Sequence, residues 1–401
     1  MSVSLEIAGG AVVRAGVPAG TSTGAREAVE LRDGDPRRYG GQGVLRAVAA
    51  INGEIDAALA GRSFMSLSAL DDALIALDGT PDKSRLGANS LVGVSIAAAR
   101  GFAAVTGTAL WQAFVGRLDF PRFPVPHFNI LSGGVQALTA LDFQEFMIAP
   151  VGAPTIAEAV RAGAEIYAAL RSLLHGRGLV AALGDEGGFA PELRQPEAAL
   201  ELLVDAIAAA GYHPGLEGVA IAVDAAATRF FAAGTYTIAG EPHSSDDLIA
   251  RYSEMVGRFP IRLIEDGLAD TDWAGWERLT AALGGRVELA GDDLFCTNPS
   301  TIALAVDRGI ANAVLIKPNQ IGTVSETLHA MRICRDAGYR RFVAHRSGET
   351  PDTFIADLAV GTGTGRLKAG APARGERVAK YDRLLQIAAG DAGCGLTYGL
   401  R

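Results

Sequence analysis

Short apolar runs that end on a charged residue recur along the second half of the chain. Six of them, each followed by a stretch of helical periodicity, occupy residues 219–224, 261–265, 287–292, 313–317, 341–345 and 366–368. A short apolar run bounded by turn residues is typical of a strand buried on both faces of a parallel sheet. The recurring strand–helix unit therefore predicts an α/β architecture.

Two further strands and two helices precede these units. The strands are predicted at residues 125–131 and 142–148, with no room for a helix between them, and the helices at 155–174 and 196–210. Eight strands in this order predict a closed ββαα(βα)6 barrel similar to a TIM barrel. An open doubly wound sheet is the alternative, and it is disfavoured because no Gly-rich dinucleotide loop follows an early strand.

The first part of the chain has a different pattern. Residues 3–7 and 11–15 alternate between apolar and polar positions, which predicts a β-hairpin, and helical periodicity follows at 43–59, 68–77 and 89–114. The segment 120–125 carries two prolines and is typical of a linker. We therefore predict a small α+β domain over residues 1–118 and the barrel, with the catalytic site, over residues 119–401.

Composition narrows the class of partner. The 401 residues carry a net charge of −9 and no basic stretch, which argues against a nucleic acid or an anionic membrane as the partner. A small anionic substrate is still compatible, because a local group of cations or bound metal ions can reverse the field in a cleft. Three widely spaced cysteines and the lack of a signal-peptide pattern predict a cytoplasmic protein.

The charged residues at the strand ends carry the candidate chemistry. In chain order they are Asp224, Glu265, Asp292, Lys317, His345 and Lys368. Parallel strands of a barrel end at one mouth, where barrel enzymes hold their catalytic groups. Any single acid is better explained as a helix cap or a solvated loop end, but six charged ends in series favour a site. Because the three carboxylates offer only oxygen donors, they predict a hard divalent cation, Mg²⁺ before Mn²⁺.

Other residues suggest proton transfer on an anionic substrate. Lys317 ends a buried run, where desolvation and neighbouring charge can lower its pKa enough for proton abstraction. The simpler explanation is a lysine that extends from the strand end into water. Glu145 and Glu186 could form a carboxylate pair in which proximity keeps one group protonated as a general acid. Arg346 and Ser347 suit a phosphate or phosphonate, so the set describes abstraction of a proton α to a carboxylate.

Several longer motifs resemble those of the enolase (phosphopyruvate hydratase) family, from about residue 3 to residue 390. The most specific are GDEGGFAP, LIEDG, GDDLFCTNP, IKPNQIGT and HRSGETPDTFIADL. The enolase superfamily is known for combining a lysine or histidine base with Mg²⁺. The resemblance implies an enolase-like fold, a homodimer or larger homo-oligomer, and dehydration of 2-phosphoglycerate to phosphoenolpyruvate.

The resemblance also implies a role for each matching residue. The ligands of a first Mg²⁺ are Asp224, Glu265 and Asp292, and a ligand of a second Mg²⁺ is Ser22. The base is Lys317, the acid side is Glu186 with Glu145, and His345 lies near the departing hydroxyl. The phosphate contacts are Arg346 and Ser347, and the contact to the substrate carboxylate is Lys368.

The chain departs from the family pattern at several points. It begins after the usual Asp-Ser-Arg-Gly-Asn-Pro motif, Gln136 stands at the substrate-binding position of a loop histidine, and Pro318 follows the base. A glutamine can hydrogen-bond there but cannot change its charge. These departures suggest a specialised paralogue, or an enzyme similar to carboxyphosphonoenolpyruvate synthase, which joins a phosphonoformyl group to an enolpyruvyl unit. An inactive enolase-fold binding protein is the alternative of another class, disfavoured because the metal carboxylates, base and acid pair are all present.

Overall fold

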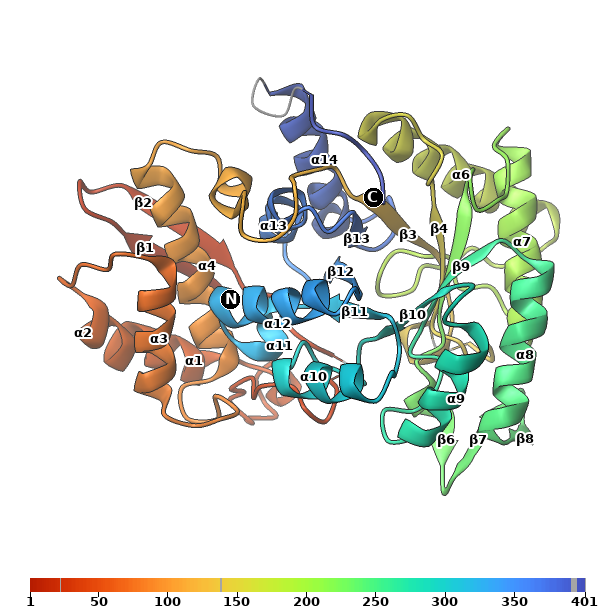
Figure 1. Cartoon of the computed structure of the whole chain (residues 1–401), viewed down its shortest axis with the longest axis horizontal. Coiled ribbons are helices and arrows are strands. Elements are labelled where there is room, and N and C mark those ends of the chain that lie inside the picture. Colours follow the sequence, from red (N-terminus) through yellow and green to blue (C-terminus); the bar gives the residue numbers. More distant parts are fainter. Residues whose placement is uncertain (22, 138, 391–394, 401) are drawn as a thin grey trace.

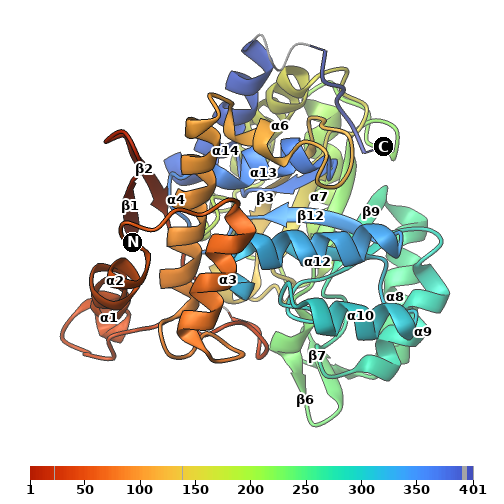
Figure 2. The same cartoon turned by 60° about the vertical axis from the view of Figure 1, so that its left-hand side comes forward.

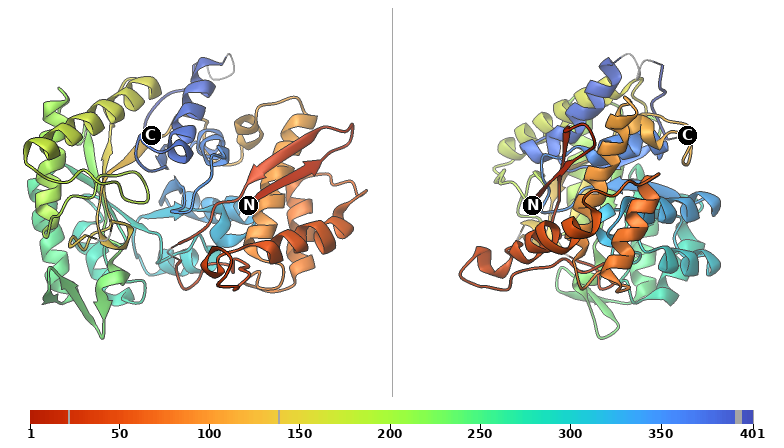
Figure 3. Two further views of the ribbon diagram at one scale, coloured as in Figure 1. Left: turned by 180° about the vertical axis from the view of Figure 1, so that it is seen from behind. Right: turned by 90° about the vertical axis from the view of Figure 1, so that its left-hand side faces the viewer.

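The chain folds into a helical amino-terminal part and a barrel that lie side by side (Figure 1). The computed structural model describes residues 1–21, 23–137, 139–390 and 395–400. The amino-terminal part begins with the predicted hairpin, in which β1 (Ser2–Glu6) and β2 (Val12–Gly16) pair antiparallel. Helices α3 (Leu67–Asp78) and α4 (Ala88–Val105) follow, and the hairpin packs against α4 (Figure 3).

Helix α4 is the core helix of this part. Its Gly93 faces the hairpin so closely that an added Cβ would lie 2.6 Å from a methyl group of Val3. Among the described helices, α4 alone is long and apolar enough to cross a membrane, but 78% of it is buried inside the protein. Core helices pass such a test because they are apolar on most sides.

Two of the predicted helices are interrupted. The stretch expected at 43–59 consists of α1 (Leu45–Ala50), a π-helical turn (Ile51–Ile55) and α2 (Asp56–Leu59). The helix expected at 89–114 ends at Val105, because Gly107 takes a left-handed conformation with φ +66°, and a 3-10 turn follows at Leu110–Phe114.

The predicted barrel is confirmed, with eight strands that close into a ring in chain order. The strands are β3 (Val125–Ser132), β4 (Glu145–Ala149), β5 (Ala220–Asp224), β9 (Ile261–Glu265), β10 (Glu288–Gly291), β11 (Ala313–Ile316), β12 (Arg340–Ala344) and β13 (Arg366–Lys368). Strand β4 runs antiparallel to both of its neighbours, and the other pairs are parallel.

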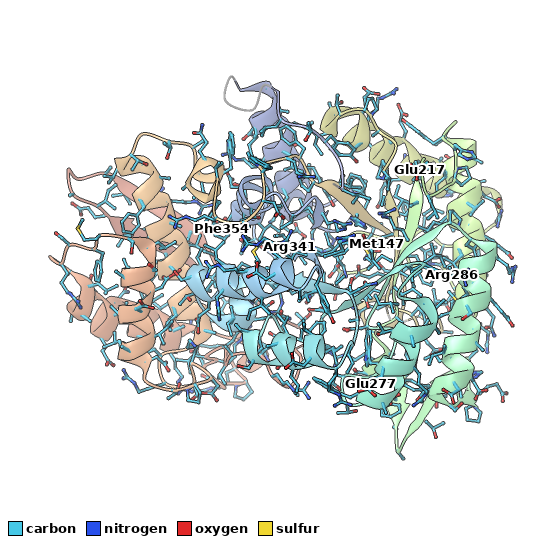
Figure 4. The ribbon with its side chains drawn as sticks, in the orientation of Figure 1. Met147, Glu217, Glu277, Arg286, Arg341 and Phe354 are labelled. Carbon is cyan, nitrogen blue, oxygen red and sulfur yellow. The ribbon has the colours of Figure 1, made fainter. Side chains whose placement is uncertain are left out.

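Helices cover the outside of the ring and apolar side chains fill its inside. The helices are α6 (Ile156–Gly176), α7 (Pro196–Ala209), α8 (Ser245–Arg258), α9 (Trp273–Leu283), α10 (Pro299–Asp307), α12 (Val324–Asp336), α13 (Phe354–Thr362) and α14 (Gly375–Ala389). Alternate strand residues such as Met147, Leu263 and Phe342 form an apolar cluster within the barrel. Figure 4 labels Met147. The cluster separates the two ends of the barrel.

The pattern of apolar residues missed several small elements, among them a short helix and a small sheet. A short helix, α5 (Gly134–Ala137), lies between β3 and β4, where no helix was expected. A three-stranded sheet of β6 (Phe231–Ala232), β7 (Thr235–Ile238) and β8 (Glu241–His243) lies in the connection from β5 to α8. Both elements are too short to give a periodic signal.

The amino-terminal part caps the start of α12, which follows the predicted base Lys317 (Figure 2). The first amides of a helix lack intrahelical acceptors. Here the amide of Val324 donates to Ser95 Oγ and that of Ser325 to Asp71 Oδ2, both at 2.9 Å. The two parts of the molecule are therefore joined beside the loop that carries Lys317.

This junction gives a pH-dependent prediction. Burial raises the pKa of Asp71 from 3.8 to about 6, against the effect of the hydrogen bonds from Ser325 and Ser95. The folded protein thus binds more protons than the unfolded chain between these values, so ionisation of Asp71 costs stability as the pH rises through this window. Two pKa units correspond to about 3 kcal/mol.

Asp71→Asn should therefore stabilise the protein at pH 8, by up to about 3 kcal/mol, and have little effect near pH 4. The measurement is denaturant unfolding as a function of pH. Asp72→Asn, on the exposed neighbour, controls for loss of a charge. A stability difference that does not depend on pH would contradict the argument.

Candidate active site

The strand ends bring the predicted charged residues together at one mouth of the barrel. A cavity of about 20 Å³ there is lined by Gln144, Glu145, Glu186, Asp224, Asp292, Lys317, His345, Arg346, Ser347 and Lys368. Glu145 joins them although it begins its strand rather than ending it. Because β4 is antiparallel, Glu145 pairs with Asp224, the last residue of β5.

Lys368 lies at the centre of the buried acids. Its Nζ is 2.8 Å from both oxygens of Glu265, 3.2 Å from Asp224 Oδ2 and 3.1 Å from Glu145 Oε2. Burial opposes the charged form, but the carboxylates outweigh it and hold the pKa of Lys368 well above its usual range. Lys368 therefore stays cationic and neutralises part of the negative charge.

Lys317 forms an ion pair with Asp292, whose other oxygen accepts a 3.0 Å hydrogen bond from Gln320 Nε2. Burial lowers the pKa of Lys317, but Asp292 and Glu265 outweigh burial, and the net pKa lies above the usual 10.5. The expectation of a lowered pKa is therefore wrong for this arrangement. The cause is the direct contact with Asp292, which the sequence did not reveal.

Glu145 and Glu186 form a carboxylate pair with opposite shifts. Burial, and then the charge of Glu186, raise the pKa of Glu145 to about 8. Burial also acts to raise the pKa of Glu186, but His345, Arg377 and Lys368 outweigh it and hold that pKa well below its usual range. Glu145 is therefore the member of the pair that keeps its proton near pH 7.

His345 connects the pair to a buried arginine. Its Nε2 lies 3.0 Å from Glu186 Oε2, and its Nδ1 lies 2.6 Å from Arg377 Nη1. A guanidinium only donates hydrogen bonds, so Nδ1 accepts and the ring proton lies on Nε2, facing Glu186. Burial, aided by Arg377, lowers the pKa of His345 to about 3, so the ring is neutral.

The acids at the mouth suit a hard divalent cation. Burial and the charge of Asp224 raise the pKa of Glu265 well above its usual range, which is the repulsion that a divalent ion would relieve. A second group of carboxylate oxygens, from Asp266, Asp292 and Asp293, lies within 4.8 Å of one another. The carboxylate of Asp266 accepts hydrogen bonds from the backbone amides of Asp292 and Asp293, each at 2.9 Å. Asp266 therefore stabilises the turn after β10.

The predicted phosphate contacts lie under the amino-terminal part of the chain. The Nη1 and Nη2 atoms of Arg346 lie 2.8 and 3.1 Å from the carboxylate of Glu27. Ser347 Oγ accepts hydrogen bonds from the amide and hydroxyl of Thr21. Ser22, the predicted ligand of a second metal ion, lies outside the described residues. The backbone of Gln136 belongs to α5, and its side chain is likewise outside the described part of the structure.

Some site residues were missed by sequence reasoning. Gln144 precedes the predicted residue Glu145, and Gln320 lies in the motif that contains Lys317. Their positions in the sequence could therefore have indicated that they belong to the site. Glu27 and Arg377 contact the site from distant segments, and the sequence does not show which group each of them pairs with.

Comparison with known proteins decides the family. The N-terminal domain model of enolase matches residues 1–114, and the C-terminal TIM-barrel domain model of enolase matches residues 121–395. The chain belongs to the enolase family. Two relatives named enolase, from Acidothermus cellulolyticus and Rubrobacter xylanophilus, are each 52% identical over 387 and 389 residues, respectively. Each alignment covers 96% of this chain and 90% of the relative.

Membership of the enolase family makes the chain an enolase-like lyase by descent, and the predicted charged residues lie together at the mouth of its barrel. The carboxylates, both lysines and the Glu145–Glu186 pair lie at the end of the barrel where enolase-fold chemistry is expected.

The neutral state of His345 in this enolase-family site can be tested by NMR. With selectively ¹⁵N-labelled histidine, the His345 ring should show the Nε2–H tautomer and should not titrate between about pH 5 and pH 8, because its pKa is about 3. His345→Gln assigns the signal by removing it. Titration within that range, or a proton on Nδ1, would show that the proposed hydrogen-bond directions are wrong.

Proposed function

We propose that the protein removes the α-proton of 2-phosphoglycerate and eliminates the 3-hydroxyl to give phosphoenolpyruvate, with two Mg²⁺ ions per site. The observation that carries the proposal is the placement of the base and the acid. Lys317 follows β11 and Glu145 begins β4, and these strands are four positions apart in a closed ring of eight. The two side chains therefore approach the cavity from opposite walls.

This arrangement suits an elimination in which base and acid act on opposite faces of the substrate. Lys317 takes the proton from C2, and the electron pair of that bond moves onto the substrate carboxylate as an enolate. The pair then forms the C2–C3 double bond as the C3–O bond breaks. The Glu145–Glu186 pair, with His345, gives the departing hydroxyl a proton and water leaves. Asp224, Glu265 and Asp292 would hold Mg²⁺, which would stabilise negative charge on the substrate carboxylate.

The substrate needs more room than the mouth offers with these contacts formed. A cavity of about 20 Å³ has space for about one water molecule. The contacts of Arg346 with Glu27, and of Ser347 with Thr21, close it from the amino-terminal side. We infer that these contacts separate when substrate enters, and that its phosphate replaces the Glu27 carboxylate on Arg346.

The ion pair of Lys317 sets a second condition. A lysine paired with Asp292 keeps its proton, so the base role requires Asp292 to be engaged elsewhere. Ligation of Mg²⁺ by Asp292 meets this condition. One substitution therefore tests both the metal site and the base.

Asp292→Asn should lower turnover of 2-phosphoglycerate at least about a hundredfold and weaken Mg²⁺ binding, since loss of even an outer partner of a metal ligand costs about 10–100-fold. Phosphoenolpyruvate absorbance and calorimetry measure the two effects. Asp336→Asn, on the exposed surface of α12, controls for the loss of a charge. Unchanged turnover in Asp292→Asn would refute the assignment.

The specialised-paralogue hypothesis depends on Gln136. A neutral amide removes a potential positive charge from the phosphate side of the site, so we expect turnover at least tenfold below a typical enzyme kcat, which is of order 10 s⁻¹. Gln136→His should raise turnover of 2-phosphoglycerate. A wild-type protein with full turnover, unchanged by Gln136→His, would make Gln136 a neutral substitution.

The phosphonate hypothesis has a separate test. Adding a nucleotide-activated phosphonoformate to 2-phosphoglycerate should yield no new product if dehydration is the whole reaction. No contact among the described residues favours phosphonoformyl transfer, and both relatives carry the name enolase. We therefore place dehydration first.

A further inference from the structure

A large cavity lies at the other end of the barrel from the candidate active site. It has a volume of about 790 Å³ and is lined by the starts of β9, β12 and β13 and by residues 115, 116 and 118–122. Its charged residues are Asp119 and five arginines: Arg122, Arg262, Arg340, Arg341 and Arg366. We call this cavity the basic pocket. Figure 4 labels Arg341 on β12.

The acids near the basic pocket leave part of its charge uncompensated. Asp119 pairs with Arg341, and Glu288 pairs with Arg366 and lies 3.7 Å from Arg262 Nη2. The charge of Glu217, which does not line the pocket, acts to raise the pKa of Arg262. Within the described residues, the side chains of Arg122 and Arg340 form no ion pair. Five cations gathered in this way stand out in a chain whose net charge is −9.

Several guanidinium donors in the basic pocket are buried without an acceptor. Among the described residues, none accepts a hydrogen bond from the Nε atoms of Arg122, Arg262 and Arg341, or from Arg341 Nη1. Arg341 is only 7% exposed. A buried donor without a partner costs stability, and buried charges are usually paired. Packing alone does not explain buried donors that have no acceptor.

We propose that the basic pocket binds a small organic anion that carries two or more phosphate groups. Guanidinium groups bind phosphate oxygens through paired N–H donors, and arginines on separate strand starts can contact more than one phosphate. The volume falls in the range of small-molecule sites. Leu118, Leu400 and Phe120, which is 86% exposed, provide apolar surface for the organic part.

This site is distinct from the proposed catalytic site. The apolar cluster of inward-facing strand residues, which includes Met147 and Phe342, lies between the two ends of the barrel. The hollow of about 790 Å³ also favours a small molecule over a nucleic acid or a membrane surface, which need an extended basic patch. The proposal therefore stands whether or not the mouth dehydrates 2-phosphoglycerate.

Calorimetry with inorganic triphosphate, ATP and adenosine tests the proposal on the full chain, with EDTA present to remove divalent ions. We expect triphosphate and ATP to bind with one site per chain, and adenosine not to bind. The double variant Arg122→Gln/Arg340→Gln should bind at least about tenfold more weakly, since it removes two charge-assisted donors. Both residues lack ion pairs among the described residues, so the fold should survive.

Two controls distinguish binding in the basic pocket from binding elsewhere on the protein. The double variant Arg171→Gln/Arg332→Gln removes two exposed charges on α6 and α12 that do not line the pocket. It should bind triphosphate with an affinity within about twofold of wild type, because salt screens the interaction with exposed charges. Lys317→Ala alters the catalytic mouth and should also leave binding unchanged. The proposal is overturned if the wild-type protein binds no triphosphate at millimolar concentration, or if adenosine binds as well as ATP. It is also overturned if both arginine double variants weaken triphosphate binding equally, or if Lys317→Ala abolishes that binding.

Discussion

The contact of one buried ammonium with carboxylates from three strands is the constraint on which the mouth of this barrel depends. Lys368 ends β13, yet it reaches Glu145 on β4, Asp224 on β5 and Glu265 on β9. Buried charges are tolerated only when they are paired, and removing one partner leaves the others exposed to repulsion. The acids, Lys368 and any bound cation therefore act as one electrostatic unit.

That unit explains how the rest of the structure is arranged around it. The barrel aligns the strand ends, the antiparallel β4 turns Glu145 into the mouth, and the amino-terminal part secures the loop of Lys317 through the cap on α12. The same part supplies Glu27 to Arg346. The α+β part of the chain thus completes the site as well as stabilising the fold.

The sequence predicted the positions of those site residues that follow from the periodicity of apolar residues and the direction of the strands. Asp224, Glu265 and Lys368 each end an apolar run, so a barrel brings them together without further information. It did not predict the contact of Lys317 with Asp292 or the approach of Arg377 to His345, because side-chain pairing across the mouth follows from three-dimensional packing. The basic pocket was missed for a similar reason, since its arginines are scattered along a chain with negative net charge.

The central claim is that the base and the acid act from opposite walls of the mouth, and solvent exchange tests it most directly. In D₂O with Mg²⁺, the C2 proton of 2-phosphoglycerate should exchange in Glu145→Gln, which retains Lys317 and removes the acid on the opposite wall, and should not exchange in Lys317→Ala. NMR of the recovered substrate measures the exchange. Loss of exchange in both variants alike, or its persistence in Lys317→Ala, would contradict the account.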